Sequence, residues 1–439
     1  MKKILGFTVI AAIGLASTSV FATKARLLAL GMNETDNEGS YYIDDNRNIF
    51  MNAANINNYA DSVIIEWGSN GASSGGSGGA NKTDQDHSPQ AEGGFFKRSG
   101  NFVYGLYYGA ESNTSSLLRV VASSPTVVGA GATGPVLDSA DNQLDIFFGG
   151  TTAGLKWAGD FVYTTDKNQS RLQNDSAMAI KLGLIGSNWD SFANISLRSK
   201  SVAYDSGVSH KFDGKLGFHV GGGYKIGNGK VFGYIKTFKW DQYDSSATAI
   251  NANRKTTVEG KFTNWSVGYA HTTEVSSKSR VFTSIAYYTK SIEADFGAAS
   301  GSATDGKTEA KNTLVPVVIG YEADATSWLT LRGSITQNLH GKRNNKNYGN
   351  MNALAQAFAG VQFGSDTKGG DVSIDSSTSV NAGATLNFGK LKLDGMIGTT
   401  NGARNGATFG TSTASGQNGR AGVLALDNLM TRVGMTYNF

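Results

Sequence analysis

Apolar and polar positions alternate along most of the chain after Asp61. In the stretch 329–340, every second residue from 329 to 335 is apolar or glycine, and the residues between them are polar. The stretch 381–388 repeats this pattern, with Ala382, Ala384, Leu386 and Phe388 on one face. Successive side chains of a β-strand point to opposite faces, so each pattern predicts a strand with one apolar and one hydrated face.

Short and long connections alternate between the predicted strands. Short joints are predicted at Ser99-Gly100, Gly149-Gly150, Gly186–Trp189, Gly227–Gly229, Thr272–Lys278, Ala323–Ser327 and Gly389-Lys390. Long polar connections are predicted at 69–91, 110–141, 165–175, 201–210, 241–254, 293–309, 341–376 and 401–429. Short periplasmic turns and long extracellular loops are typical of transmembrane antiparallel β-barrels. We therefore predict an all-β barrel of about 16 strands, with 14 as the alternative.

Pro316 is the one awkward residue within a predicted strand. Proline has no N–H to donate to a neighbouring strand. In a closed barrel every strand is paired on both sides, so proline cannot occupy a free edge, where the missing donor would cost no hydrogen bond. We therefore expect a β-bulge, or the loop end of the strand, at Pro316.

The last ten residues form an alternating strand that ends on an aromatic side chain. Val433, Met435, Tyr437 and Phe439 share one face. This ending resembles the C-terminal assembly signal of Gram-negative outer-membrane β-barrels. The resemblance implies outer-membrane lipid and the barrel assembly machinery as partners.

The N-terminus has the pattern of a secretory signal peptide. Lys2 and Lys3 precede an apolar run over 4–16, and small residues near Ala22 suit a leader peptidase, so residues 1–22 are predicted to be removed. Downstream, no apolar run approaches the roughly 20 residues of a spanning helix, so a membrane location requires a closed barrel. The chain has no cysteine, which excludes a lipid anchor on cysteine and a disulfide scaffold. Residues 61–439 are assigned to the barrel.

Residues 23–60 lack a clear strand period. An acidic pair, Asp44 and Asp45, leads to Phe50, and Asn52 and Ala54 follow. This order resembles the opening motif of the FadL-type outer-membrane transporters of fatty acids and hydrocarbons, although Ala53 stands where that family has proline. The resemblance implies a plug inside the barrel, with Asp45, Phe50 and Asn52 as its plug residues. A periplasmic extension is the alternative.

Composition narrows the function further. The chain has 57 glycines, 39% hydrophobic residues and a formal net charge of +4. Modest hydrophobicity suits strands that contact lipid on one side and water on the other. The basic residues are scattered, so we expect no nucleic-acid partner.

Two sequence patterns match catalytic or cofactor signatures without their structural setting. Residues 71–75 fit G-x-S-x-G but lie in a glycine- and serine-rich run, and residues 129–134 fit the dinucleotide fingerprint but precede Pro135. The five histidines show no metal-ligand spacing. We expect no enzyme activity, no cofactor and no metal.

Charged residues on the hydrated parity are predicted to line the lumen. They are Lys181, Arg198, Lys200, Lys215, Lys225, Arg332, Lys392, Asp394 and Arg432. Two interpretations stay open: solvated charges that keep the lumen wet, or a cationic pore that favours anions.

These observations predict an outer-membrane porin-like channel for passive diffusion of small hydrophilic solutes. Two alternatives stay open: a FadL-type transporter of hydrophobic compounds, and a surface adhesin or receptor that uses the long loops. The sequence leaves open whether barrels associate as trimers.

Overall fold

The computed structural model describes eleven parts of the chain. They are residues 23–32, 39–68, 91–109, 143–168, 173–205, 208–244, 257–295, 307–346, 370–373, 378–402 and 432–439. The predicted signal peptide and much of the predicted long loops lie outside these residues. Within them, no helix is both long and apolar enough to cross a membrane.

Three short helices precede the strands. They are α2 (Lys24–Ala29), η2 (Asn46–Ile49) and η3 (Ala53–Asn57). The strands of the first half are β1 (Ser62–Gly68), β2 (Ala91–Ser99), β3 (Phe102–Tyr108), β4 (Gln143–Thr152), β5 (Leu155–Asn168), β6 (Gln173–Ile185), β7 (Trp189–Asp205), β8 (Val208–Gly214) and β9 (Gly217–Ile226). Those of the second half are β10 (Gly229–Asp244), β11 (Thr257–Ser276), β12 (Ser279–Asp295), β13 (Lys307–Asp324), β14 (Leu329–Lys346), β15 (Gly370–Ser373), β16 (Thr378–Phe388), β17 (Leu391–Gly402) and β18 (Arg432–Asn438).

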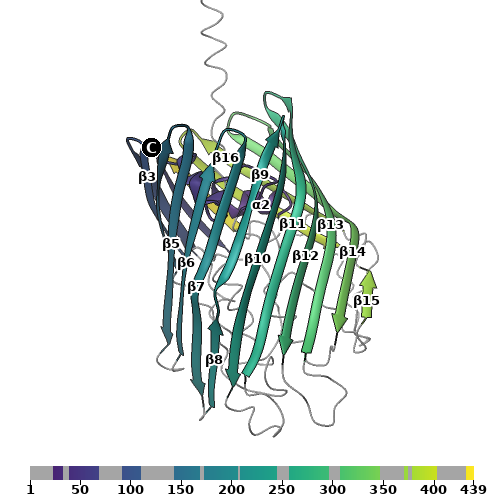
Figure 1. Ribbon diagram of the computed structural model, residues 1–439. Helices are drawn as coiled ribbons and strands as arrows, with labels where there is room; N and C mark the ends of the chain where they lie inside the picture. Colours follow the sequence, from purple (N-terminus) through teal and green to yellow (C-terminus); the bar gives the residue numbers. More distant parts are fainter. Residues whose placement is uncertain are drawn as a thin grey trace, which may run out of the picture.

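The strands close into one antiparallel barrel (Figure 1). β1 pairs with both β2 and β18, so the sheet has no free edge at the chain ends. Two barrel positions are each built from two segments: β8 and β9 both pair with β7 and β10, and β15 and β16 both pair with β14. The barrel therefore has 16 strand positions, which confirms the predicted number and excludes 14.

The short turns gather at the end of the barrel where the C-terminus lies, which we call the turn end (Figure 1). Six of the predicted joints fall between the observed strands or overlap their turns. The joint predicted at Gly149-Gly150 is wrong, because β4 continues to Thr152 and the turn lies at Ala153 and Gly154. Both turn residues have positive φ, 49° and 81°, a conformation that glycine adopts without strain.

The outer face of the barrel is apolar and the inner face is mostly covered. On β14, Leu331 and Ile335 are 44% and 52% exposed, whereas Arg332 and Ser334 between them are 7% and 5% exposed. This contrast confirms which side of this strand faces outward, as the alternation predicts.

β-bulges interrupt the alternation at a few positions. The pairing of β13 with β14 shifts register between Val315 and Pro316, so the bulge expected at Pro316 is confirmed. A second shift lies between Met178 and Ala179, which pair with Arg198 and Ser196 and leave Leu197 as the extra residue of β7. An extra residue reverses which parity faces inward beyond it. This reversal matters for the site below.

The C-terminal strand β18 completes the barrel between β17 and β1. Tyr437 and Phe439 are exposed on its outer side, and the half-buried Val433 and Met435 share that parity, opposite the fully buried Thr436. The ring of Phe439 lies 4.5 Å from the Lys97 ammonium nitrogen. Recognition of this strand by an assembly machinery stays a prediction.

Candidate functional site

Residues 23–32 and 39–60 lie inside the barrel near the turn end, and we call them the inner segment (Figure 1). Its two 3-10 helices begin at polar caps: the Asp45 carboxylate accepts from the Arg47 backbone amide at 2.9 Å, and the Asn52 side-chain oxygen Oδ1 accepts from the Ala54 backbone amide at 3.1 Å. Asparagine and aspartate are favoured at such positions because they satisfy free amides. Ala53 is the first residue of η3, a position that proline also tolerates. The FadL-type motif stays a resemblance, because no family model matches the chain.

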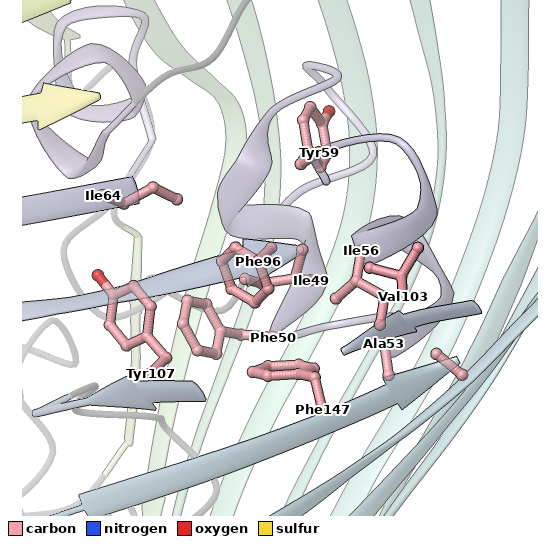
Figure 2. Close-up of a cluster of buried hydrophobic side chains, with 11 residues drawn as sticks. Ile49, Phe50, Ala53, Ile56, Tyr59, Ile64, Phe96, Val103, Tyr107 and Phe147 are labelled. Carbon is pink, nitrogen blue, oxygen red and sulfur yellow. The ribbon is translucent and has the colours of Figure 1, made fainter. Parts of the chain in front are cut away.

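Aromatic side chains pack the inner segment against the wall on three sides. Phe50 meets Tyr107 of β3 and Phe147 of β4 edge-on, with ring centroids 5.0 and 6.1 Å apart (Figure 2). Elsewhere Tyr41 stacks on Phe232 of β10 at 4.9 Å. A third cluster joins Leu27, Leu30, Tyr42 and Ile43 to Phe282 of β12. Burying these rings holds the segment in place without directional bonds.

A group of six charged residues, the Arg26 cluster, links the inner segment to four strands: β12, β13, β14 and β17. Its members are Arg26, Asp45, Arg280, Glu322, Arg332 and Asp394. The Arg26 guanidinium lies 2.8 Å from Asp45 of the same segment and 2.8 Å from Glu322 of β13. Arg332 continues the chain to Asp394 at 3.0 Å. Three cations face three carboxylates, so the cluster is balanced in charge.

Burial shapes the titration of the two members that belong to the inner segment. Burial raises the pKa of Asp45 to about 6, although Arg26 acts in the opposite direction. Burial by itself lowers the pKa of Arg26, but Glu322 and Asp45 outweigh it and raise this pKa above its usual value. Arg26 is therefore charged at neutral pH.

A second group, the Arg47 cluster, links the inner segment to β1, β2 and β3. It consists of Lys24, Arg47, Glu66, Glu92 and Tyr107. Arg47 lies 3.0 Å from Glu66 and 3.4 Å from Glu92, and its guanidinium also donates to the Tyr107 hydroxyl at 3.1 Å. The Lys24 ammonium pairs with Glu92. Two cations balance two carboxylates here as well.

Glycines in the wall allow the inner segment to approach the strand backbone. A Cβ on Gly183 of β6 would lie 2.5 Å from the Ala54 nitrogen, and one on Gly383 of β16 would lie 2.6 Å from the Ala29 Cβ. Beside Gly183, the Asn52 side-chain amide donates to the Ser191 backbone carbonyl at 3.2 Å. Side chains at these two glycines would push the segment away.

The contacts of the inner segment extend around the whole barrel. The two charge clusters reach β1, β2, β3, β12, β13, β14 and β17. Phe147, Ala158, Asn194 and Phe232 add β4, β5, β7 and β10, and Ala270 of β11 belongs to the same cluster as Tyr41. Tyr41 lies beside Gly223 of β9. Three further strands approach the segment at glycines: β6 at Gly183 beside Asn52, β16 at Gly383 beside Ala29, and β18 at Gly434 beside Thr23. Every barrel strand position therefore takes part.

A cavity of about 380 Å³ lies between the inner segment and the wall at the turn end. Asparagines of the segment, Tyr41, Asp190, Lys225 and Lys230 contribute to its lining. Asp190 accepts from the Tyr41 hydroxyl at 3.0 Å and pairs with Lys230 at 2.6 Å. Polar groups of the inner segment and of the wall therefore line this cavity together with apolar side chains such as Met51 and Ile185.

Five of the residues predicted to line the lumen lie on the inner face. Lys181 is fully buried between Asp145 and Asp160, and its ammonium lies 5.2 Å from the Phe50 ring. Arg332 and Asp394 belong to the Arg26 cluster. Lys392 shares its face with the buried Thr436, and Lys225 lines the turn-end cavity. The structure thus brings four of these five residues close to the inner segment or into contact with it.

The placement of Arg198 and Lys200 in the lumen is wrong. Phe192, Asn194 and Ser196 are buried on the inner side of β7, and after the extra residue Leu197 the buried position is Ser199. The bulge therefore turns Arg198 and Lys200 to the outer side. Lys200 lies 3.7 Å from Asp213 there.

Lys215 does not line the lumen either, because it lies at the break between β8 and β9. It pairs at 2.7 Å with Asp241, which follows the inward-facing and fully buried Trp240 on β10. The side chain of Arg432 lies outside the described part of the structure.

The prediction that positive charge dominates the inner face missed several acidic residues there. Glu66, Glu92, Asp160 and Glu322 are all at most 6% exposed, and they neutralise cations of the segment or wall. Strand parity could have found Glu66 and Glu322, because each alternates with outward apolar residues. Nothing in the local pattern predicts Arg26 and Arg47 as their partners.

Among the described residues, no three histidine, cysteine or acidic side chains are grouped so as to hold a metal ion. No family model matches the chain, and no curated protein matches it. The similar solved structures are outer-membrane barrels. An anion-selective porin from Comamonas acidovorans is 12% identical, with a TM-score of 0.31 over 74% of this chain and 95% of that one.

Two further barrels are similar at the same level. The toluene transporter TodX of Pseudomonas putida is 10% identical, with a TM-score of 0.31 over 92% of this chain and 96% of that one. OmpT, an outer-membrane protein of Vibrio cholerae, is 11% identical, with a TM-score of 0.32 over 86% of this chain and 95% of that one. These scores are too low to indicate a function, so the proposals below rest on the chain's own residues.

Proposed function

We propose that this protein is an outer-membrane channel for small hydrophilic solutes, and that the inner segment is a plug that closes its lumen at the turn end. The carrying observation is that the contacts of the segment involve every strand position of a closed barrel. A barrel of 16 strands is wide enough for an aqueous lumen, so an open pore exists only when the plug leaves.

Location follows from the surface of the barrel. Large apolar side chains cover its outer face, including Leu182, Val267, Ile319 and Ile335, each between 47% and 52% exposed. An apolar band around a closed barrel, with backbone groups paired internally, suits a bilayer. Export by the predicted signal peptide would deliver the chain to the periplasm, from which the barrel would insert into the outer membrane.

Ion pairs of the Arg26 and Arg47 clusters hold the plug in the barrel, and undocking would break them together. Removing one partner of a buried ion pair leaves the other charge buried without compensation, at a cost of about 3–5 kcal/mol. Arg26 and Arg47 each serve two carboxylates, and Arg26 pairs with one carboxylate of the segment and one of the wall. Opening then means undocking of the segment, and solutes diffuse through the wet lumen without an energy source.

The test combines single-channel conductance with chemical labelling. The chain has no native cysteine, so Ala25→Cys, at a position 1% exposed within α2, gives a unique reporter of undocking. We expect the wild-type barrel to be mostly closed in a planar bilayer and the reporter to react slowly. Arg26→Met should raise both the open fraction and the labelling rate by at least tenfold.

A matched control is Lys97→Met. Lys97 pairs with Asp61 at 2.9 Å at the turn end, but both side chains are more than a third exposed. Exposed pairs contribute little to stability, so this variant should behave as wild type. Wild-type barrels that are constantly open, or rapid labelling of Arg26→Met without a rise in conductance, would refute the plug.

A second candidate, a transporter of hydrophobic compounds, is favoured by one observation. Aromatic side chains gather on the inner face of β8, β10 and β11, away from the inner segment. Phe238 stacks on Phe262 at 5.1 Å and lies 5.6 Å from Trp240, and Phe212 stacks on Trp240 at 6.4 Å. If liposomes that contain Arg26→Met swell in arabinose, the hydrophilic channel is supported. If liposomes with wild type and liposomes with Arg26→Met both fail to swell, and the protein takes up toluene, the transporter of hydrophobic compounds is supported. The loops needed by an adhesin lie largely outside the described residues.

A further inference from the structure

The outer face of β10 and β11 changes its chemistry in steps from the turn end toward the opposite end of the barrel, which we call the loop end. Residues directly opposite each other in antiparallel strands place their side chains on the same face as neighbours. Successive outward pairs of these two strands are Ile235 with Trp265, Thr237 with Thr263, Lys239 with Lys261, and Asp241 with Glu259. The order toward the loop end is therefore apolar, hydroxyl, basic and acidic.

Trp265 marks the border of the lipid-facing band on the side of the loop end. Its exposed ring lies 5.2 Å from the exposed ring of Tyr287 on β12. Nearer the turn end, the outward side chains of β11 are Tyr269 and Val267, both exposed. Aromatic side chains collect at the level of the lipid headgroups in transmembrane barrels, because one end of the ring is apolar and the other polar. The headgroup level therefore begins near Trp265.

Lys239 and Lys261 lie just beyond this border. Lys261 is four residues from Trp265 on β11, which corresponds to about 13 Å along the strand at about 3.3 Å per residue. The hydroxyl oxygens of Thr237 and Thr263, 3.4 Å apart, lie between the border and the lysines. Short turns of outer-membrane barrels face the periplasm, so the loop end faces the outer leaflet. The two ammonium groups therefore lie at the depth of the outer-leaflet headgroups.

The two lysines are like charges directly opposite each other on neighbouring strands. Like charges in this arrangement repel. Glu293 of β12 lies 3.9 Å from the Lys261 ammonium, but both side chains are about half exposed, at 45% and 52%, so this contact offsets little of the repulsion. Lys215 adds a third cation beside them, because its backbone N–H donates to the Lys239 carbonyl at 2.7 Å. This part of the outer face therefore attracts an anion.

Carboxylates of the same face lie one step farther toward the loop end. Asp213 of β8 is directly opposite Asp241 of β10. Lys200 and Lys211 each lie 3.7 Å from Asp213, and Lys215 lies 2.7 Å from Asp241. Both acids are therefore matched by lysines other than the opposed pair. An anion that approaches from the bilayer meets Lys239 and Lys261 before these acids.

We propose that Lys239 and Lys261 bind the phosphate group of a phosphorylated lipid headgroup in the outer leaflet. A phosphomonoester carries a charge of about −1.5 to −2 at neutral pH and three acceptor oxygens, so two ammonium groups can share it. Lysine binds phosphate as a point charge, and a shared dianion replaces the repulsion of the pair with attraction. The acyl chains of the same lipid would pack on the apolar side chains nearer the turn end, such as Ile235 and Val267. This site goes beyond the channel, because it lies on the outer face and needs no open lumen.

The experiment measures lipid binding to the full-length protein in detergent micelles by native mass spectrometry. The probes are diphosphoryl lipid A and the same lipid A from which both phosphates have been removed. We expect the phosphorylated lipid to bind about tenfold more tightly, because only it supplies charge-assisted contacts to the lysines. The double variant Lys239→Gln, Lys261→Gln should weaken binding of diphosphoryl lipid A about tenfold, since both contacts are lost.

Two further variants separate charge from position. The double variant Lys239→Arg, Lys261→Arg keeps both cations, so binding of diphosphoryl lipid A should stay within about twofold of wild type. Lys278→Gln is the matched control: Lys278 is exposed in the turn that joins β11 to β12, at the turn end of the same hairpin, and its removal should change nothing. Heat-modified gel migration checks that each variant is folded.

Three results would overturn the lipid site. The first is equal binding of the phosphorylated and dephosphorylated lipid, or equal binding by wild type and the double glutamine variant. The second is a loss in Lys278→Gln as large as that in the double variant, because general attraction to positive charge would then explain binding. The third is displacement of the lipid by an equal concentration of inorganic phosphate, which would assign the pair to a soluble anion. None of these results depends on conductance, so they leave the test of the channel independent.

Discussion

The Arg26 cluster and a row of polar wall residues are both polar regions of the barrel interior, but they differ in which parts of the chain they join. The row consists of residues that face one another on successive strands: Asn194, His219, Lys236, Asn264, Lys290 and Asn312. In the cluster, three cations meet three carboxylates at 2.8 to 3.2 Å, and the residues come from the plug and the wall. In the row, cations and amides come from the wall alone and include no acid. Balanced charges suit docking of one part of a chain on another. The row, in contrast, belongs to the wall alone and joins neighbouring strands.

The largest effect is expected from replacing Arg26, the cation that Asp45 and Glu322 share. Arg26→Met leaves Asp45 and Glu322 buried without their common partner, so docking of the plug should weaken by about 3–5 kcal/mol. We expect a much larger open fraction in single-channel recordings. Lys236→Met, which removes a cation of the row, should leave the open fraction unchanged and lower anion preference in reversal-potential measurements.

Equal opening by the two variants would show that the cluster and the row do not differ in role. Circular dichroism and heat-modified gel migration provide the control for folding, because the wall contacts of the barrel are intact in both variants. A barrel that fails to assemble would migrate identically whether boiled or not.

A smaller effect is expected where the plug approaches the wall most closely. In Gly183→Ala the new methyl group would lie 2.5 Å from the Ala54 nitrogen, so η3 must shift. Overpacking of this kind costs about 1–3 kcal/mol. The open fraction should rise roughly tenfold or more, at an unchanged anion preference.

Gly159→Ala is the matched control for that variant. Gly159 lies on the neighbouring strand β5, and the nearest atom to an added Cβ is 3.6 Å away, which is ordinary contact. This alanine should leave conductance as in wild type. An effect as large as that of Gly183→Ala would mean that strand flexibility, and not contact with the plug, controls opening.

The pH dependence of opening should follow the titration of Asp45. Burial raises the pKa of Asp45 to about 6, above the 3.8 of an exposed aspartate, so the docked plug binds a proton more tightly than the undocked one. This group therefore favours docking most below about pH 4, and its contribution is lost as pH rises to about 6. Open fraction should increase between pH 4 and 6 and level off above.

Asp45→Asn should remove that dependence, because an amide does not titrate in this range. The charged groups that act on Asp45 are Arg26, which contacts it, and Asp394, which lies farther away in the same cluster. A pH profile of Asp45→Asn that matches wild type would assign the dependence to another group.

The amino-acid sequence by itself determined the barrel. Alternation in 329–340 and 381–388 fixed which faces are apolar, and turn residues such as Gly227 and Gly389 placed the hairpins. Proline chemistry predicted the bulge at Pro316. These features are local, because a strand's two faces and its turns depend on residues close together in the chain.

Only the tertiary structure decided which charges meet. No proline marks the bulge at Leu197, yet it turns Arg198 and Lys200 away from the lumen. Arg26 and Glu322 are nearly 300 positions apart and pair only because the plug lies inside a closed sheet. The polar row likewise depends on the register of six strands, which is set by pairing around the whole barrel and not by any one stretch of chain.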